Sequence, residues 1–121
     1  MANSFVTLPA REVARTFPDE RIAKDAQHIL EWIRVAINRQ SYLGALPPIR
    51  AFTAEDGSLL IEWIFDDFRV GFSLEQNQED SGWFLVSKPE KGGIAASGSL
   101  VKAKARNIIS WLVNFVINNV S

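Results

Sequence analysis

The sequence predicts one α+β domain: an N-terminal helix, an antiparallel meander of four to five strands and a C-terminal helix, with both helices packed on one sheet face. Two observations predict this class. Apolar residues recur at helical spacing near both ends of the chain, and they alternate with period two between those segments. The length of 121 residues fits a single domain over residues 1–121, with 1–15 a possible extended arm.

The first helix is expected over residues 16–39. Thr16 is a plausible N-cap, Pro18 is tolerated in a first turn, and Asp19 and Glu20 suit the positive end of the helix. An apolar stripe follows at helical spacing, made of Ile22, Ala26, Ile29, Leu30, Ile33 and Ile37. Residues 1–15 show no such period, so we expect an extended arm or a short strand there.

The segment LLIEWIFDDFRVGFSL, residues 59–74, predicts a β-hairpin that turns at Asp66 and Asp67. The expected cross-strand pairs are Phe65 with Phe68, Trp63 with Val70, Ile61 with Phe72 and Leu59 with Leu74. All eight side chains then share one face, because strand side chains alternate. This face is the predicted core.

The remaining strands are expected on both sides of that hairpin. Residues 49–55 form a strand that turns at Asp56-Gly57, and a two-residue turn there would place Phe52 opposite Ile61, on the core face. Residues 83–88 form a fourth strand. Residues 94–98 form a weak edge strand, because alanine, serine and glycine are poor strand formers.

The C-terminal helix is expected over residues 99–119, with Ser99 as a possible N-cap. Its only consistent polar line is Asn107, Ser110, Asn114 and Asn118. A helix this apolar is mostly buried. Trp111, Val113 and Ile117 nevertheless exceed what a simple buried stripe needs, so they are a candidate contact surface.

Composition excludes several classes of function. The chain has no cysteine, which removes disulfides, thiol nucleophiles and thiolate metal sites. Thirteen basic and fourteen acidic residues lack the basic excess typical of nucleic-acid binders. No signal-peptide pattern opens the chain, and the longest apolar stretch, residues 108–120, is too short to span a bilayer. We expect a soluble cytoplasmic protein without a membrane partner.

Catalytic motifs are weak. The sole histidine, His28, is interpreted as an exposed helix residue, and we expect neither a metal nor a cofactor. Glu62, Asp66 and Asp67 could hold a divalent metal, but turn chemistry and a cross-strand Glu62–Arg69 ion pair explain them more simply. Basic residues gather in the last third of the chain, at Lys88, Lys91, Lys102, Lys104 and Arg106. They indicate either a solvated helix start or a local anionic partner.

The second face of the predicted sheet is half apolar, which makes it a candidate contact surface. Its candidate residues are Ile49, Leu60, Glu62, Ile64 and Arg69, with Trp111 and Ile117 of the last helix as a further surface. The leading hypothesis is a non-enzymatic module that binds another protein or forms a homodimer. The alternative is a small-molecule-binding domain with an aromatic-lined pocket between helices and sheet.

The pattern of Pro47 or Pro48, Asp56-Gly57 and Glu62-Trp63 resembles a group of small uncharacterised prokaryotic proteins. In these a helix and a proline-containing lead-in precede an Asp-Gly turn and a strand ending in Glu-Trp. The similarity covers about residues 20–75. It implies a shared fold and an accessory or regulatory role, and it carries no activity to this chain.

Overall fold

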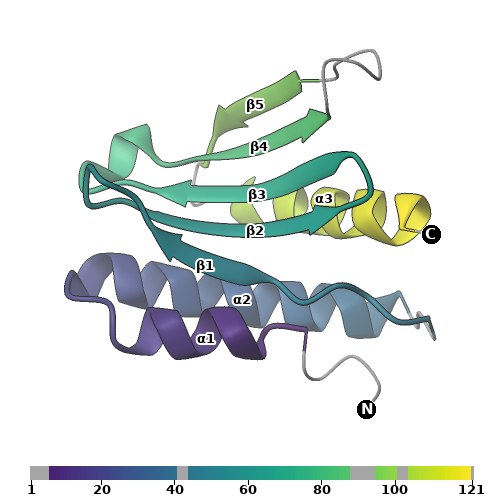
Figure 1. The fold of residues 1–121 in the computed structure, drawn as a ribbon, viewed down its shortest axis with the longest axis horizontal. Coiled ribbons are helices and arrows are strands. Elements are labelled where there is room, and N and C mark those ends of the chain that lie inside the picture. The colour runs from purple at the N-terminus through teal and green to yellow at the C-terminus, as the bar shows by residue number, and fades with distance from the viewer. Residues whose placement is uncertain (1–5, 41–43, 88–94, 101–103, 121) are drawn as a thin grey trace.

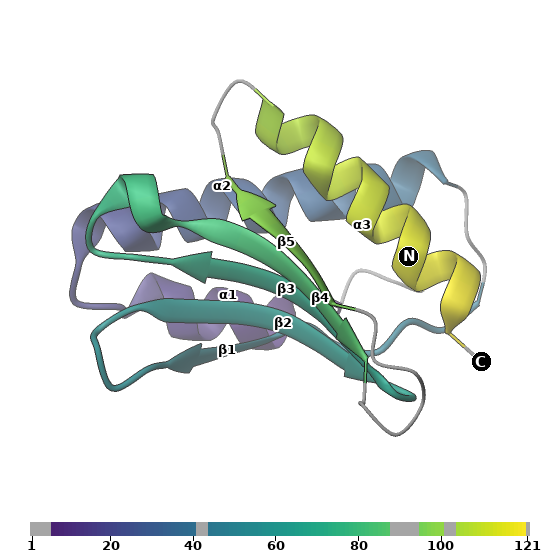
Figure 2. The ribbon, with the colours of Figure 1, turned by 90° about the horizontal axis from the view of Figure 1, so that it is seen from above.

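A computed structural model describes residues 6–40, 44–87, 95–100 and 104–120. Three α-helices surround one face of a five-stranded antiparallel sheet, whose strand order β1-β2-β3-β4-β5 follows the chain (Figures 1 and 2). The α+β class is therefore confirmed. Its strands are β1 (Arg50–Thr53), β2 (Leu59–Phe65), β3 (Phe68–Leu74), β4 (Gly82–Ser87) and β5 (Ala95–Ser99).

The helices cover the sheet from one side. α1 (Leu8–Arg15) packs on β1 and on α2 (Glu20–Arg39), and α2 also contacts α3 (Ala105–Asn119). In Figure 2 α2 and α3 lie on one side of the sheet, and α1 lies behind β1 and β2 in this view. A short 3-10 helix, η1 (Gln78–Asp80), interrupts the connection from β3 to β4.

The central hairpin has the register that the sequence predicts. Phe65 pairs with Phe68, Trp63 with Val70, Ile61 with Phe72 and Leu59 with Leu74. Asp66 has a positive φ of 49°, a conformation that aspartate tolerates and that two-residue hairpin turns use at their first central position. Trp63 and Phe72 are each 1 % exposed, so the predicted core face is buried beneath the helices.

The first hairpin has a different register from the predicted one. Its loop contains three residues, 55–57, and closes with hydrogen bonds from Gly57 N to Ala54 O and from Ala54 N to Ser58 O. Gly57 adopts a φ of 86°, which only glycine adopts without strain. The extra loop residue shifts the pairing by one, so Ala51 lies opposite Ile61 and Phe52 opposite Leu60. Phe52 therefore moves from the core face to the opposite face.

The N-terminal region also differs from expectation. Residues 8–15 form helix α1 where an extended arm or strand was expected, with Pro9 in its first turn and Ala10 and Ala14 fully buried. Thr16 ends this helix instead of capping the next. A proline disfavours the helical conformation in the residue before it, so Pro18 favours a break between the two helices. The N-cap of α2 is consequently Asp19, whose carboxylate accepts from Ile22 N at 3.0 Å.

The C-terminal helix begins later than predicted. Ser99 is the last residue of β5, paired with Gly82, and α3 starts at Ala105 with Lys104 at its N-cap position. Pairing with β4 provides hydrogen-bond partners for the backbone of residues 95–99, and this outweighs the low strand propensity of their alanine, serine and glycine residues. The predicted polar line of the helix is confirmed as exposed: Asn107, Ser110, Asn114 and Asn118.

Candidate functional site: the open face of the sheet

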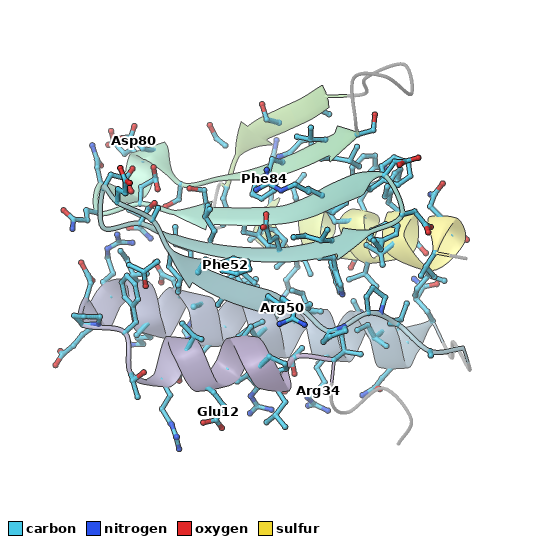
Figure 3. All side chains as sticks on the ribbon, in the orientation of Figure 1. Glu12, Arg34, Arg50, Phe52, Asp80 and Phe84 are labelled. Carbon is cyan, nitrogen blue, oxygen red and sulfur yellow. The ribbon has the colours of Figure 1, made fainter. Side chains whose placement is uncertain are left out.

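The outer face of the sheet, the one turned away from the helices, is only partly polar. Three of its large apolar side chains are well exposed: Phe52 at 42 %, Ile64 at 53 % and Val86 at 38 %. Leu60 and Phe84 are half-buried beside them. In Figure 3 Phe52 and Phe84 lie on the viewer's side of the sheet, with Arg50 below them. We call this set, Arg50, Phe52, Leu60, Glu62, Ile64, Arg69, Phe84 and Val86, the open face.

Strand pairing brings these side chains together from four strands. Arg50 and Phe52 come from β1, and the pairs Arg50–Glu62 and Phe52–Leu60 join them to β2. Ile64 is paired with Arg69 of β3, which is paired in turn with Val86 of β4. Because side chains directly opposite each other lie on the same face, the open face is one continuous surface.

Glu62 lies at the centre of the open face and is nevertheless buried, with only 4 % of the residue exposed. Its strand partner is Gly71, where an added Cβ would lie 2.7 Å from Glu62 Cα and 2.8 Å from Glu62 Cβ. The absence of a side chain at Gly71 therefore leaves space into which the Glu62 side chain can settle. No larger residue fits there without moving the backbone.

Arg69 joins the buried carboxylate to an aromatic ring. Its Nη2 donates to Glu62 Oε2 at 2.9 Å, which confirms the predicted cross-strand ion pair. Its guanidinium carbon lies 5.8 Å from the centre of the Phe84 ring, within cation–π range. Two contacts thus hold a guanidinium group whose side chain is half exposed, and its free N–H groups remain available to an acceptor on another molecule.

One predicted contact residue is misplaced. Ile49 precedes β1, is 1 % exposed, and donates its backbone N–H to Val6 O at 2.7 Å. It therefore belongs to the core and not to the outer face. The same one-residue difference in register that moves Phe52 outward turns Ala51 toward the core.

Trp111 and Ile117 lie on α3, on the opposite side of the sheet from the open face. Trp111 is 51 % exposed, whereas Ile117 is half-buried and packs on the core. Trp111 ends a chain of ring contacts that runs through Phe115 at 6.3 Å and Phe68 at 5.1 Å into the interior. It also meets Trp83 edge-on at 5.9 Å. These contacts give Trp111 a packing role beside its exposure.

The space between α2 and the sheet contains a small cavity of about 50 Å³. It is lined by Asp25, His28, Ile29, Trp32, Leu74, Gln78, Ser81, Leu100 and Ala105. Pockets for drug-sized ligands measure roughly 300–1,000 Å³. A cavity of this size holds a few waters, so it gives little support to an aromatic-lined ligand pocket between helices and sheet.

The acidic residues considered as metal ligands do not converge. In the described parts of the chain, no three histidine, aspartate or glutamate side chains are placed to hold a metal ion. Glu62 forms an ion pair with Arg69, and Asp66 and Asp67 form the hairpin turn. Asp56 has a local role: hydrogen bonds from the Ser58 hydroxyl and backbone N–H lower the pKa of its carboxyl.

Sequence reasoning missed four members of the open face: Arg50, Phe52, Phe84 and Val86. For Phe52 the signal was present, because a three-residue hairpin loop with glycine in its last position is the common alternative to a two-residue turn. Val86 follows from the register of the fourth strand against β3.

Searches against family models, curated proteins and solved structures found no match to this chain. No helix among residues 6–40, 44–87 and 104–120 is long and apolar enough to cross a membrane.

Proposed function

We propose that the protein is a non-enzymatic binding module that contacts a partner protein through the open face of its sheet. One observation carries the proposal. Of the five exposed large hydrophobic residues among the described residues, three lie on this face: Phe52, Ile64 and Val86. Isolated apolar side chains are normal on a protein surface, whereas a continuous apolar patch marks an interaction site.

The charges of the open face favour a different protein over a second copy. Its two guanidinium groups, Arg50 and Arg69, are exposed, while its central carboxylate, Glu62, is buried beneath Arg69. A two-fold dimer places the same patch on both sides of the interface. Two copies would therefore bring exposed cations together at the patch centre, whereas a partner with acidic groups beside apolar ones would pair with them.

The composition of the face also suits an interface. Aromatic residues and arginine are enriched in protein interfaces, and lysine and glutamate are depleted. Phe52, Phe84, Arg50 and Arg69 belong to the first group. An accessory or regulatory role would follow, because the protein would act through the activity of its partner.

Site-specific photocrosslinking in the native cells tests the proposal. A photoreactive phenylalanine analogue is placed at Phe52, Ile64 or Val86, and at the exposed helix positions Gln27 and Asn114 as matched controls. We expect one protein adduct of the same mass from all three sheet positions and none from the helix positions. Adducts that form equally from helix and sheet positions would contradict the proposal.

Self-association is the second candidate, and light scattering distinguishes it. If the open face joins two copies, the purified chain is a dimer at high micromolar concentration and the crosslinked adduct has twice the mass of the chain. The variant Ile64→Glu should then be monomeric, because a charge at the most exposed apolar position of the face cannot be buried unpaired. A wild-type monomer at that concentration would eliminate this candidate.

A further inference from the structure

A second surface feature lies away from the open face, in a groove between α2 and α3. The groove has a volume of about 230 Å³. Its walls are Trp32, Val35, Ala36 and Arg39 of α2, with Arg106 and Ser110 of α3. It is larger than the cavity beside the sheet, and its lining combines apolar side chains with two cationic groups from different helices.

Among the residues that the structure describes, no carboxylate lines this groove. Arg39 and Arg106 also form no ion pair within the described residues, in contrast to Arg15, Arg21, Arg34 and Arg69. The chain as a whole carries a net charge of -1, so this concentration of positive charge is local. Two unpaired guanidinium groups at one groove give a potential that attracts an anion.

Arg106 makes a cation–π contact with Trp32. Its guanidinium carbon lies 5.3 Å from the centre of the Trp32 ring. A cation–π contact does not use up the N–H groups of the guanidinium, which can still bind a carboxylate in a bidentate manner. An arginine fixed in this way loses less conformational entropy when it binds than a mobile one does.

The position of Arg106 is otherwise unfavourable. It lies in the first turn of α3, where the helix macrodipole disfavours a cation, and that turn contains no acidic residue. Lys104, at the N-cap position, makes no side-chain hydrogen bond to the helix end. A bound anion would offset the repulsion among these groups.

We propose that this groove binds a small carboxylate with an apolar body. The carboxylate lies between Arg39 and Arg106, and the apolar body packs against Trp32, Val35 and Ala36. The same chemistry occurs in free aryl or alkyl carboxylic acids and at the C-terminus of a peptide that ends in an apolar residue. This site is independent of the open face and of the protein partner proposed for it.

Nuclear magnetic resonance of the tryptophan side chains tests the proposal. The probe is 4-phenylbutyrate, titrated into the ¹⁵N-labelled full chain, and a Trp32→Phe variant assigns the Trp32 signal. We expect a saturable shift of the Trp32 indole N–H. The Trp63 indole should not move, because it is 1 % exposed and donates to Pro47 O at 3.0 Å.

Matched ligands and variants locate the interaction. The neutral amide 4-phenylbutanamide should bind at least about tenfold more weakly, because it lacks the charge that the arginines pair with. Arg39→Gln and Arg106→Gln should each lower the affinity for 4-phenylbutyrate by about tenfold or more. Arg11→Gln, an exposed arginine of α1 replaced in the same way, should leave the affinity unchanged.

Four results would overturn the proposal: no saturable shift, equal binding of the amide, no effect of either groove variant, or equal binding of inorganic phosphate, which has charge without an apolar body. A further titration with N-acetylglycylphenylalanine separates the two sources. Tighter binding of this peptide would assign the groove to a chain terminus, and tighter binding of 4-phenylbutyrate would assign it to a free acid. Both results require that the groove binds a carboxylate.

Discussion

At the scale of single residues, Glu62 shows how an open sheet face can bury a charge. Its carboxylate settles over Gly71 and is neutralised by Arg69, which is itself held against Phe84. The sequence predicts the ion pair, because the two residues are diagonal neighbours on adjacent strands. It does not predict the burial, which depends on the missing side chain at Gly71 and on the position of the Arg69 side chain over the carboxylate.

Replacing Arg69 should therefore cost more than replacing another arginine of the same face. Arg69→Ala leaves a nearly buried carboxylate without its partner, and we expect a loss of about 1–2 kcal/mol in the free energy of unfolding. Arg50→Ala, which breaks no ion pair among the described residues, should change it by less than about 0.5 kcal/mol. Chemical denaturation measures both. Equal losses in the two variants would show that the ion pair contributes no net stability.

A second residue-scale prediction concerns pH and Asp56. The Ser58 hydrogen bonds lower the pKa of this carboxyl in the folded protein, so they stabilise the fold above the ordinary pKa of aspartate. That contribution is lost as the pH falls through the lowered pKa of the folded state. The difference in unfolding free energy between wild type and Asp56→Ala should thus shrink from pH 7 toward pH 3. A difference that stays constant over this range would contradict the assignment.

At the scale of elements, the sequence predicts those with a strong period and misplaces those without one. Residues 59–74 fold with the predicted register, because a slip by one residue would expose Trp63 and Phe72. Helix α1 has no comparable signal, because its buried face consists largely of Ala10 and Ala14. The register of the β1–β2 hairpin depends on whether its loop has two or three residues, and the Asp-Gly pair is compatible with both.

The register of that first hairpin can be tested with two phenylalanines. Phe72 is 1 % exposed, so Phe72→Ala should lower the unfolding free energy by about 3–5 kcal/mol. Phe52 is 42 % exposed on the open face, so Phe52→Ala should cost less than about 1 kcal/mol. With a two-residue turn Phe52 would face the core, and the two losses would be similar. Thermal or chemical unfolding of both variants separates these alternatives.

In the whole molecule, the inner face of the sheet forms the core and the outer face is left uncovered by the helices. The inner face, with Trp63, Phe65, Val70 and Phe72, packs under three helices and supplies the core. The sequence predicts this division from the alternation of residues 59–74. The exact membership of the open face could not be predicted, because it depends on the register of β1, which moves Phe52 outward and places Ile49 inside.

The central claim is that the apolar residues of the open face contribute to contact and not to folding. It is tested most directly by the unfolding free energy of the triple variant Phe52→Thr, Ile64→Thr and Val86→Thr, in which each new residue keeps a high strand propensity. We expect the unfolding free energy to stay within about 1.5 kcal/mol of wild type, since one substitution at an exposed position changes it by about 0.5 kcal/mol. A loss as large as that of a single core substitution, about 3–5 kcal/mol, would contradict the claim and show that this face is part of the folding core.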